Sequence, residues 1–287
     1  FLIMRILVTG ATGFVGQHLI PVLSHYHSLL CIVRDIQKAK TLYGDDVEYL
    51  QTNELSSVKD FGPEIVVHLA SYLTSQDDSD SMHKLLEANI VFGTELLNAL
   101  RNCKIKLFIN IGSFAEYRLG PASTDSAYLY TATKTAFKSI LKYYADIGGY
   151  PYVHLIPYTI YGGNDTKKKI FDYVKDSLDS VKPIDMTLGE QILDFIHVDD
   201  VVECINYFID HMDIVISKGL VDYHLGTGRG MSIRDLAAFI ETKYGKKTNI
   251  SWGARPYRPR DVMYAVAPIG NLIDIGYRAK RRIEDYL

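Results

Sequence analysis

Apolar residues in the first 162 positions gather in short continuous runs that alternate with stretches of helical periodicity. The runs predict buried strands at residues 5–10, 29–34, 64–70, 106–112 and 152–162. The periodic stretches predict helices at residues 14–26, 81–102 and 128–148. Continuous apolar runs are typical of parallel strands that are covered on both faces. The alternation therefore predicts an α/β fold with a doubly wound parallel sheet.

After about residue 162 this pattern loosens. The later segment mixes short strand signals with short helical signals, at residues 184–188, 201–212, 223–228, 233–245 and 249–253. We expect residues 1–162 to form the first domain and residues 163–287 to form mainly a smaller substrate-binding lobe. Part of the later chain is allowed to return to the first domain.

The composition is that of an ordinary soluble protein, with 47% hydrophobic residues, 23% charged residues and a net charge of −3. This balance predicts no attraction to nucleic acid or to a membrane surface, and no apolar run is long enough to span a bilayer. Residues 1–10 run into a glycine turn without the cleavage pattern of a signal peptide. Three cysteines, Cys31, Cys103 and Cys204, lack metal-binding spacing. They predict buried thiols, no metal site and a cytoplasmic location.

A glycine pattern follows the first predicted strand directly. Gly10, Gly13 and Gly16 have the spacing G-x-x-G-x-x-G at the start of the first predicted helix. In this context the first glycine allows a tight turn, the second lets a pyrophosphate approach the backbone, and the third permits close helix–sheet packing. The pattern predicts a Rossmann-type dinucleotide site. Further cofactor contacts in the same turn are expected from Thr12, Phe14 and Val15.

The end of the second predicted strand bears on the adenosine ribose of the dinucleotide. Arg34 comes first there and Asp35 follows. An arginine suits a 2′-phosphate, whereas an acidic residue accepts hydrogen bonds from the ribose hydroxyls. Arg34 therefore favours NADPH over NAD. The alternative is that Asp35 binds the ribose and Arg34 is solvated.

A phenol and an amine lie one helical turn apart in the third predicted helix. Tyr130 and Lys134 have i, i+4 spacing on one face, whereas Tyr128 lies on a different face. Because a phenol has an ordinary pKa of about 10, it needs nearby positive charge to exchange a proton at neutral pH. Lys134 is expected to lower the pKa of Tyr130. Ser113, at the end of a predicted strand, is placed to donate to a substrate oxygen.

These motifs occur in one order along nearly the whole chain, together with "HLAS", "EANIVFGTELL", "GEQILDFIHVDDVV", "YHLGTG" and "YRPRDV". The set resembles the extended short-chain dehydrogenase/reductase family, the NAD-dependent epimerase/dehydratases of nucleotide sugars. The C-terminal half is similar to the CDP-abequose/CDP-paratose synthase type. That type comprises NADPH-dependent 4-ketoreductases of CDP-3,6-dideoxyhexuloses.

The resemblance implies a ketone reduction. Tyr130 is then the proton donor, Lys134 binds the nicotinamide ribose, and Ser113 holds the carbonyl oxygen. It also implies contacts outside this catalytic set. Cofactor contacts are expected from Leu69, Ala70, Asn89 and Pro157, and substrate contacts from Tyr72, Phe114, Thr159 and Arg258.

The residues after Ser113 limit which family reaction the chain can perform. Phe114 and Ala115 occupy the two positions at which the family's 4,6-dehydratases carry an Asp–Glu pair. Ala115 also occupies the position at which the GDP-fucose-forming epimerase–reductases have a cysteine. The sequence therefore favours NADPH-dependent reduction of a CDP- or dTDP-linked 4-keto-deoxyhexose. Two alternatives stay open: a nucleotide-sugar 4-epimerase with retained NAD, and a catalytically silent NADP-binding sensor.

Two positions depart from the family pattern. Leu193 and Ile156 occupy positions at which the family usually has arginines, so the usual arginine contacts with the substrate diphosphate are missing. We assign this role mainly to Arg258. The lysines Lys167–Lys169 are interpreted as a solvated face.

Several other polar residues receive structural interpretations. His68 lies within an apolar strand and is expected to be a core histidine. His197, Asp199 and Asp200 resemble a metal or acid/base site, but carboxylates at the start of a helix commonly cap it. Finally, the segments 83–100 and 130–147 are apolar on more than one side. They predict a homodimer formed through two helices of each subunit.

Overall fold

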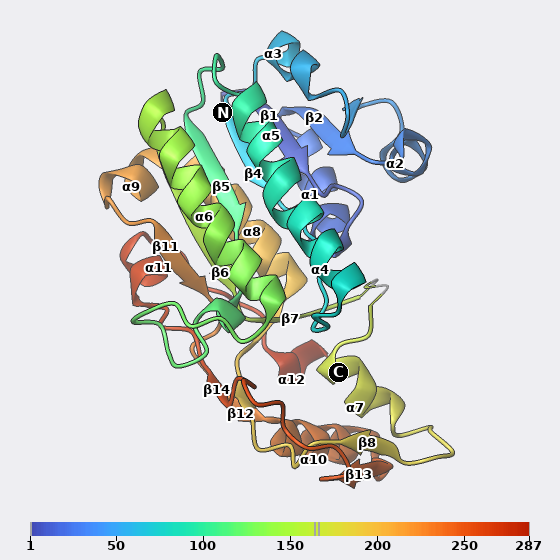
Figure 1. Cartoon of the computed structure of the whole chain (residues 1–287). Helices are drawn as coiled ribbons and strands as arrows, with labels where there is room; N and C mark the ends of the chain where they lie inside the picture. Colours follow the sequence, from blue (N-terminus) through green and yellow to red (C-terminus); the bar gives the residue numbers. More distant parts are fainter. Residues whose placement is uncertain (1, 164, 166, 287) are drawn as a thin grey trace.

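A parallel sheet forms the centre of the molecule (Figure 1). The computed structural model describes residues 2–163, 165 and 167–286. Seven strands pair in the order β11-β6-β5-β4-β1-β2-β3, and each of these pairings is parallel. Their bounds are β1 Arg5–Thr9, β2 Ser28–Val33, β3 Glu48–Gln51, β4 Ile65–His68, β5 Leu107–Ile111, β6 Tyr152–Pro157 and β11 Asp222–Leu225. The doubly wound Rossmann-type sheet expected from the sequence is confirmed.

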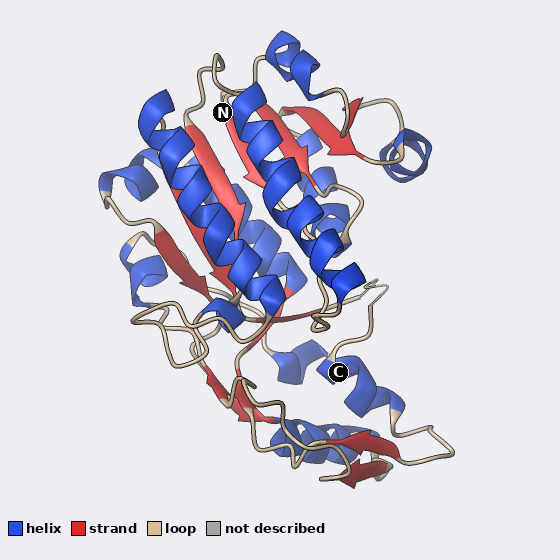
Figure 2. Cartoon of the chain, in the orientation of Figure 1, coloured by secondary structure: helices blue, strands red, loops and turns tan. Residues whose placement is uncertain are grey.

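Helices cover both faces of the sheet (Figure 2). One face carries α1 and α8 and the other carries α4, α5 and α6. Strand β1 shows the reason, because successive side chains of a strand point to opposite faces. Ile6 and Val8 belong to one core cluster, with residues of α1 and α8, whereas Leu7 belongs to another, with residues of α5 and α6. The helices of the sheet layers are α1 Phe14–Ser24, α2 Ile36–Tyr43, α3 Val58–Phe61, α4 Ser79–Leu86, α5 Phe92–Ala99, α6 Leu129–Gly148, α8 Val198–Asp210, α9 Met212–Ser217 and α11 Gly270–Asp274.

The strand order reverses at β1, which pairs with β2 on one side and with β4 on the other. In open α/β sheets, ligands bind outside the carboxyl ends of the strands at such a reversal. The glycine turn after β1 and the "HLAS" segment after β4 both lie there. The topology therefore gathers the predicted cofactor residues at one crevice.

Two later segments belong to the sheet layers rather than to the smaller lobe. Strand β11 pairs in parallel with β6, and α8 packs against α1. The sequence analysis allowed part of the later chain to return to the first domain, and α8 and β11 are two such segments. Helix α8 followed by β11 repeats the helix–strand pattern of the earlier crossovers and adds an edge strand to the sheet late in the chain. The division of the chain near residue 162 stays a prediction.

The smaller lobe lies beyond the carboxyl ends of the strands (Figure 2). Its strands and helices are β7 Thr159–Tyr161, α7 Ile170–Asp176, β8 Ile184–Met186, β9 Ile192–Leu193, β10 Phe195–His197, β12 Met231–Ser232, α10 Ile233–Tyr244, β13 Ile250–Trp252, β14 Tyr264–Ala265 and α12 Ile283–Tyr286. A separate core cluster fills it, including Val174 of α7 with Leu236 and Ile240 of α10. Asp194, fully buried between β9 and β10, accepts hydrogen bonds from Thr227, Gly228 and Ala267. This carboxylate joins the lobe to the segment after β11.

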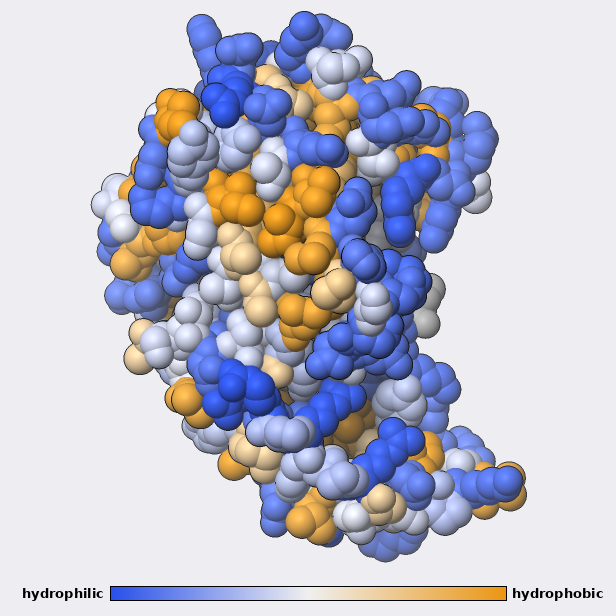
Figure 3. Space-filling model, viewed as in Figure 1, coloured by the Kyte–Doolittle hydropathy of each residue, from blue (hydrophilic) through white to orange (hydrophobic). Residues whose placement is uncertain are grey.

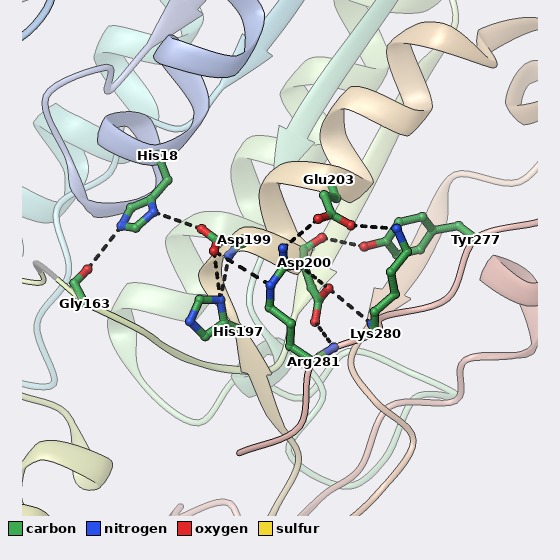
Figure 4. A network of polar contacts seen from close by, with 9 residues as sticks. All are labelled: His18, Gly163, His197, Asp199, Asp200, Glu203, Tyr277, Lys280 and Arg281. Carbon is green, nitrogen blue, oxygen red and sulfur yellow. Dashed lines mark hydrogen bonds and ion pairs between the residues drawn. The ribbon is translucent and has the colours of Figure 1, made fainter. Parts of the chain in front are cut away.

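A second buried carboxylate ties the C-terminal segment to α8 (Figure 4). Asp200 accepts hydrogen bonds from the N–H groups of Lys280 at 3.2 Å and Arg281 at 2.9 Å, and from the Arg281 guanidinium at 2.8 Å. His197 precedes α8 and its Nδ1 accepts from the Asp199 N–H at 3.2 Å. The cap of α8 is therefore the His197 imidazole, and not the carboxylate that the sequence analysis expected. No helix in the described part of the chain is long and apolar enough to cross a membrane.

Candidate active site

The glycine turn between β1 and α1 is shaped by close backbone contacts. Gly10 has a φ of +71°, and a Cβ there would lie 2.6 Å from the backbone nitrogen of Ala70. A Cβ at Gly16 would lie 2.4 Å from the Gly10 carbonyl oxygen. Gly13 precedes α1 and makes no side-chain cap. The first N–H groups of α1 are therefore left for an anion, and the turn fits the pyrophosphate of a dinucleotide.

The neighbours of Gly13 form the rim of this turn. Thr12 and Val15 are partly buried, and the Thr12 carbonyl accepts from the Gln17 amide at 3.1 Å. The Phe14 ring stacks edge-on against His18, and the Lys169 ammonium lies 4.5 Å from the centre of the Phe14 ring. A cation from the lobe thus reaches the start of α1.

Arg34 and Asp35, the two candidates for binding the adenosine ribose, differ in whether their side chains already have hydrogen-bond partners. Arg34 is exposed just after β2, and its guanidinium has no hydrogen-bond or ion-pair partner among the residues that the structure describes. Asp35 caps α2, because its Oδ1 accepts from the Lys38 N–H at 3.0 Å. One of the two side chains already has a structural task, and the other is free for a ligand.

The end of β4 is fixed against β1 by a threonine. The Thr9 hydroxyl lies 2.8 Å from His68 Nδ1 and accepts from the Ala70 N–H at 3.1 Å. Burial lowers the pKa of His68 to about 3, so this histidine is neutral, and its ring packs near Phe137. His68 is the core histidine that the sequence analysis expected. Leu69 and Ala70 continue from it into the crevice beside Gly10.

Asn89 joins the loop after β4 to the catalytic helix. It is almost fully buried in a π-helical turn, Glu87–Val91. Its Oδ1 accepts from the Tyr72 N–H at 2.7 Å and from Ser71 Oγ at 3.2 Å, and its Nδ2 donates to the Tyr72 carbonyl and to Thr133 Oγ1. Because both amide atoms are occupied by protein groups, Asn89 supports the site rather than offering a free ligand group.

Lys134 is almost fully buried behind Tyr130 on α6. Its Nζ donates to the Ile111 carbonyl at 2.7 Å and lies 5.9 Å from the centre of the Tyr130 ring. Burial lowers the pKa of Lys134 to about 8, and the negative charge of Glu116 acts in the opposite direction. The i, i+4 spacing therefore does bring the two side chains together.

Tyr130 does not have the lowered pKa that its lysine neighbour suggested. Burial raises the pKa of Tyr130 to about 12, although a hydrogen bond with Ser71 acts to lower it. Desolvation of the phenolate is the largest cause, and the negative charge of Glu116 acts in the same direction. A phenol with this pKa is protonated at neutral pH, which is the state that a proton donor requires.

Tyr128 belongs to the lobe side of the site. Its hydroxyl donates to Asp261 Oδ1 at 3.0 Å, and the Arg258 guanidinium lies 5.5 Å from the centre of its ring. Burial and the Asp261 charge raise the pKa of Tyr128 to about 12. Its hydroxyl is therefore held by a carboxylate across from the catalytic helix.

Ser113 ends the segment after β5 and starts a 3₁₀ turn, Phe114–Glu116. Its Oγ accepts from the Ala115 N–H at 3.3 Å, and its own N–H donates to Glu116 Oε1 at 2.8 Å. Since the cap uses the hydroxyl as an acceptor, its O–H stays available as a donor. Ser113 can therefore donate to a carbonyl oxygen.

A pocket of about 600 Å³ lies between the sheet and the lobe, a volume typical of small-molecule sites. Phe114, which follows Ser113, lines it on the sheet side, while Ser113, Tyr130 and Lys134 do not line it themselves. Four cationic side chains line the pocket: Lys168, Lys169, Arg255 and Arg258. Lys167 and Lys168 are exposed, as the sequence analysis expected, whereas Lys169 is only partly exposed and pairs with Asp165 at 2.9 Å.

The two missing arginines do not have equal consequences. Leu193 lines the pocket, whereas Ile156 is fully buried in β6 and packs in the lobe cluster. Arg258 extends over Tyr128 at the pocket, and the Arg255 guanidinium lines it without a hydrogen-bond or ion-pair partner among the described residues. Sequence reasoning missed Arg255, although an arginine three residues before Arg258 was a signal that could have found it.

The remaining predicted contacts do not line this pocket themselves. Tyr72 is partly buried under the Lys167 ammonium, which lies 5.7 Å from the centre of its ring. Pro157 is buried at the end of β6. Thr159 follows at the start of β7, and its buried hydroxyl has no hydrogen-bond partner among the described residues.

The sequence pattern described as the NAD dependent epimerase/dehydratase family matches residues 6–226. The chain belongs to this family. The match extends from β1 to the residue after β11, so it covers the whole parallel sheet together with the catalytic helix.

Curated relatives of this epimerase/dehydratase chain include two CDP-abequose synthases. The protein of Yersinia pseudotuberculosis is 25% identical over 287 residues, which cover 99% of this chain and 98% of the relative. The protein of Salmonella typhimurium is 29% identical over 307 residues, which cover 100% of this chain and 98% of the relative. Full-length coverage means that the lobe is aligned as well as the sheet.

Solved structures share the fold of this family member. The UDP-glucose 4-epimerase of Thermus thermophilus in complex with NAD has a TM-score of 0.81 at 21% identity, covering 98% of this chain and 96% of that chain. The UDP-glucuronic acid 4-epimerase of Bacillus cereus, crystallised with NAD and a fluorinated UDP-sugar, has a TM-score of 0.84 at 20% identity, with coverages of 98% and 96%. Within the described residues, no cluster of His, Cys, Asp and Glu side chains could hold a metal ion.

Proposed function

We propose that this chain reduces the 4-keto group of a CDP- or dTDP-linked deoxyhexulose with NADPH. A protonated phenol beside a buried lysine carries the proposal, because Tyr130 has a raised pKa of about 12 and Lys134 lies behind its ring. Phe114 and Ala115 follow Ser113 and offer no acid or base for dehydration. The full-length similarity to curated CDP-abequose synthases supports the choice of a nucleotide-sugar substrate.

In this mechanism the nicotinamide supplies the hydride, and the protein orients the ketone and supplies the proton. The Ser113 hydroxyl donates to the carbonyl oxygen, and Tyr130 donates the proton that makes the alcohol. Lys134 stays charged below its pKa of about 8 and stabilises the phenolate left on Tyr130. Proton donation by an oriented group is worth about 10²–10⁴-fold in rate.

The turn residues fit the cofactor that this reaction needs. Gly10, Gly13 and the start of α1 offer backbone N–H groups and space for a pyrophosphate. The unpartnered Arg34 supports NADPH, because its guanidinium can pair with a 2′-phosphate, while Asp35 is occupied as a helix cap.

For the substrate diphosphate we propose Arg258, assisted by Arg255, in place of the arginine that is missing at Leu193. Both guanidiniums are exposed at the pocket, and neither makes an ion pair among the described residues. Arg260, in contrast, is held by Asp125 and by the Ser126 carbonyl at 2.9 Å, so it anchors the loop instead.

A homodimer through α4–α5 and α6 remains our proposal for the assembly. Figure 3 shows an apolar patch on the face that these helices form. Large apolar side chains exposed on them include Leu86, Val91, Tyr143 and Ile147. Light scattering of the purified protein tests the proposal, and a monomer at micromolar concentration would contradict it.

A substrate panel tests the proposed function. Purified protein is mixed with NADPH or NADH and with CDP-, dTDP-, UDP- or GDP-linked 4-keto-deoxyhexoses, and cofactor absorbance is followed. We expect NADPH oxidation in proportion to the sugar, with the CDP- or dTDP-linked compound. Interconversion of 4-hydroxyl epimers without added cofactor would instead indicate an epimerase.

A further inference from the structure

Glu116 is a buried carboxylate beside the catalytic residues that the reaction scheme does not yet use. Its side chain is fully buried and lies three residues after Ser113. It accepts hydrogen bonds from the Ser113 N–H at 2.8 Å, from Thr135 Oγ1 at 2.8 Å and from His154 Nε2 at 3.2 Å. Burial raises the pKa of Glu116, but these hydrogen bonds and the electrostatic interaction with His154 outweigh it and hold the pKa below its ordinary value.

The three donors come from the three elements that build the catalytic centre. Ser113 follows β5, Thr135 follows Lys134 on α6, and His154 lies in the middle of β6. Gly112 leaves the space for this junction, since a Cβ there would lie 2.4 Å from His154 Nε2 and 2.7 Å from Glu116 Oε1. One carboxylate therefore fixes the serine turn against the catalytic helix.

His154 is bonded on both ring nitrogens. Its Nδ1 lies 2.9 Å from Asn110 Nδ2, and its Nε2 lies 3.2 Å from Glu116 Oε1. The titratable groups that interact with the Glu116 charge are Lys134 and Tyr130 on α6, Tyr117 just after the 3₁₀ turn, His154 on β6 and His224 on β11. Of these, Lys134 is the group whose charge the proposed reaction uses.

We propose that Glu116 is a positioning residue for the reduction, which holds the Ser113 turn on the catalytic helix and keeps Lys134 charged from behind the site. This inference rests on the proposed function. Glu116 is not itself a proton donor to the substrate, because its side chain is fully buried and faces β6.

Two substitutions separate the two parts of this role. Glu116→Gln keeps an oxygen acceptor and removes the charge, so Lys134 should lose its proton at a lower pH. We expect the alkaline limb of the kcat profile to move down by about one pH unit, with little change at pH 6. Glu116→Ala also releases the Ser113 turn, so kcat should fall about tenfold or more at every pH, with the KM for NADPH within a factor of about two.

Two readouts need no substrate and therefore remain valid if the proposed reductase activity fails. In protein with ¹³C-labelled lysine, the Lys134 resonance, assigned by its loss in Lys134→Met, should titrate about one unit lower in Glu116→Gln. Amide hydrogen exchange of residues 111–117 should accelerate in Glu116→Ala and not in Glu116→Gln.

Asp200→Asn is the matched control, because it also removes a fully buried carboxylate charge, but at the C-terminal segment. It should lower thermal stability and leave the Lys134 titration unchanged. The proposal is overturned if Glu116→Gln behaves like this control, or if Glu116→Ala loses only thermal stability while kcat per folded molecule is kept.

Discussion

The two walls of the active-site crevice hold their ligands by different means. On the sheet wall, the turn after β1 offers backbone N–H groups, and its shape depends on Gly10 and Gly16, where a Cβ would collide with backbone atoms. On the lobe wall, the pocket offers side-chain cations, among them Arg255 and Arg258, on exposed segments. The sheet wall thus offers backbone N–H groups held in a fixed turn, and the lobe wall offers the cationic ends of flexible side chains.

This difference explains why the chain follows its family on one wall and departs from it on the other. A backbone nest tolerates no side chain at its glycines, so its sequence pattern is rigid. A diphosphate can be paired with guanidiniums that reach it from several positions. Leu193 on the lobe wall is therefore compatible with substrate binding as long as Arg255 and Arg258 face the pocket.

The largest expected effect separates the tyrosines of the two walls. Tyr130→Phe removes the proton donor, so kcat should fall by about 10²–10⁴-fold with the substrate KM nearly unchanged. Tyr128→Phe removes only the bond to Asp261 on the lobe wall, and kcat should fall less than about tenfold. Steady-state kinetics with both variants check this, and equal losses would remove the distinction between the two phenols.

The backbone character of the sheet wall is tested by a pair of glycines. Gly10 and Gly44 have nearly the same φ, +71° and +70°, but only at Gly10 would a Cβ meet other atoms within 4 Å. Gly10→Ala should weaken NADPH binding by about 100-fold, from backbone strain plus overpacking. Gly44→Ala carries the strain alone and should leave the dissociation constant within about twofold. Titration of cofactor fluorescence measures both, and similar losses would mean that the turn does not act through its shape.

The proposed role of Arg34 in cofactor binding depends on a side-chain charge rather than on backbone geometry. Arg34→Ala should raise the KM for NADPH by about 10–100-fold, because a charge-assisted contact with the 2′-phosphate is lost. The KM for NADH should stay the same. A wild-type protein that prefers NADH would contradict the role proposed for Arg34 and would favour the alternative, in which Asp35 binds the ribose.

On the lobe wall, the arginines should be partly interchangeable. Arg258→Ala should raise the KM for the nucleotide sugar by about tenfold, and Leu193→Arg in that background should recover part of the loss. Arg260→Ala serves as the control, since Arg260 is held by Asp125 and Ser126, and it should lower the melting temperature rather than change KM. If Arg258→Ala leaves KM unchanged, the diphosphate is bound elsewhere.

The smallest expected effect is a pH dependence. Lys134 is charged below its pKa of about 8 and neutral above it, while Tyr130 keeps its proton up to about 12. Reduction should therefore slow several-fold between pH 7 and pH 9, with Lys134 as the titrating group. A flat profile across this range would show that the charge on Lys134 does not matter for the chemical step.

Local spacing made part of this site predictable. The glycine turn and the Tyr130–Lys134 pair depend on residues within one turn of a strand–helix unit, so a single sequence reveals them. Glu116 could not be found in this way, because its partner His154 lies 38 residues later and only the sheet brings them together. The pKa of Tyr130 was also beyond the sequence, since it depends on burial by distant segments.

The pairing of strands that lie far apart in the chain was also not predicted from the sequence. Strand β11 is short and its sequence pattern resembles the strands of the lobe, but it pairs with β6, while α8 packs against α1. The sequence could have suggested this, because a helix followed by an apolar strand repeats the earlier crossover pattern. The contribution of Ser71 to Tyr130 was missed for a similar reason, as the two residues lie on different elements.

Deuterium transfer tests the central claim most directly. The protein is incubated with NADPH that carries deuterium at C4 of the nicotinamide and with a CDP-linked 4-keto-3,6-dideoxyhexose, and the product is examined by NMR and mass spectrometry. The account predicts one deuterium at C4 of the sugar for each NADPH oxidised, with transfer about 10²–10⁴-fold slower in Tyr130→Phe. A sugar that gains no deuterium while its C4 hydroxyl isomers interconvert on a retained NAD would contradict it.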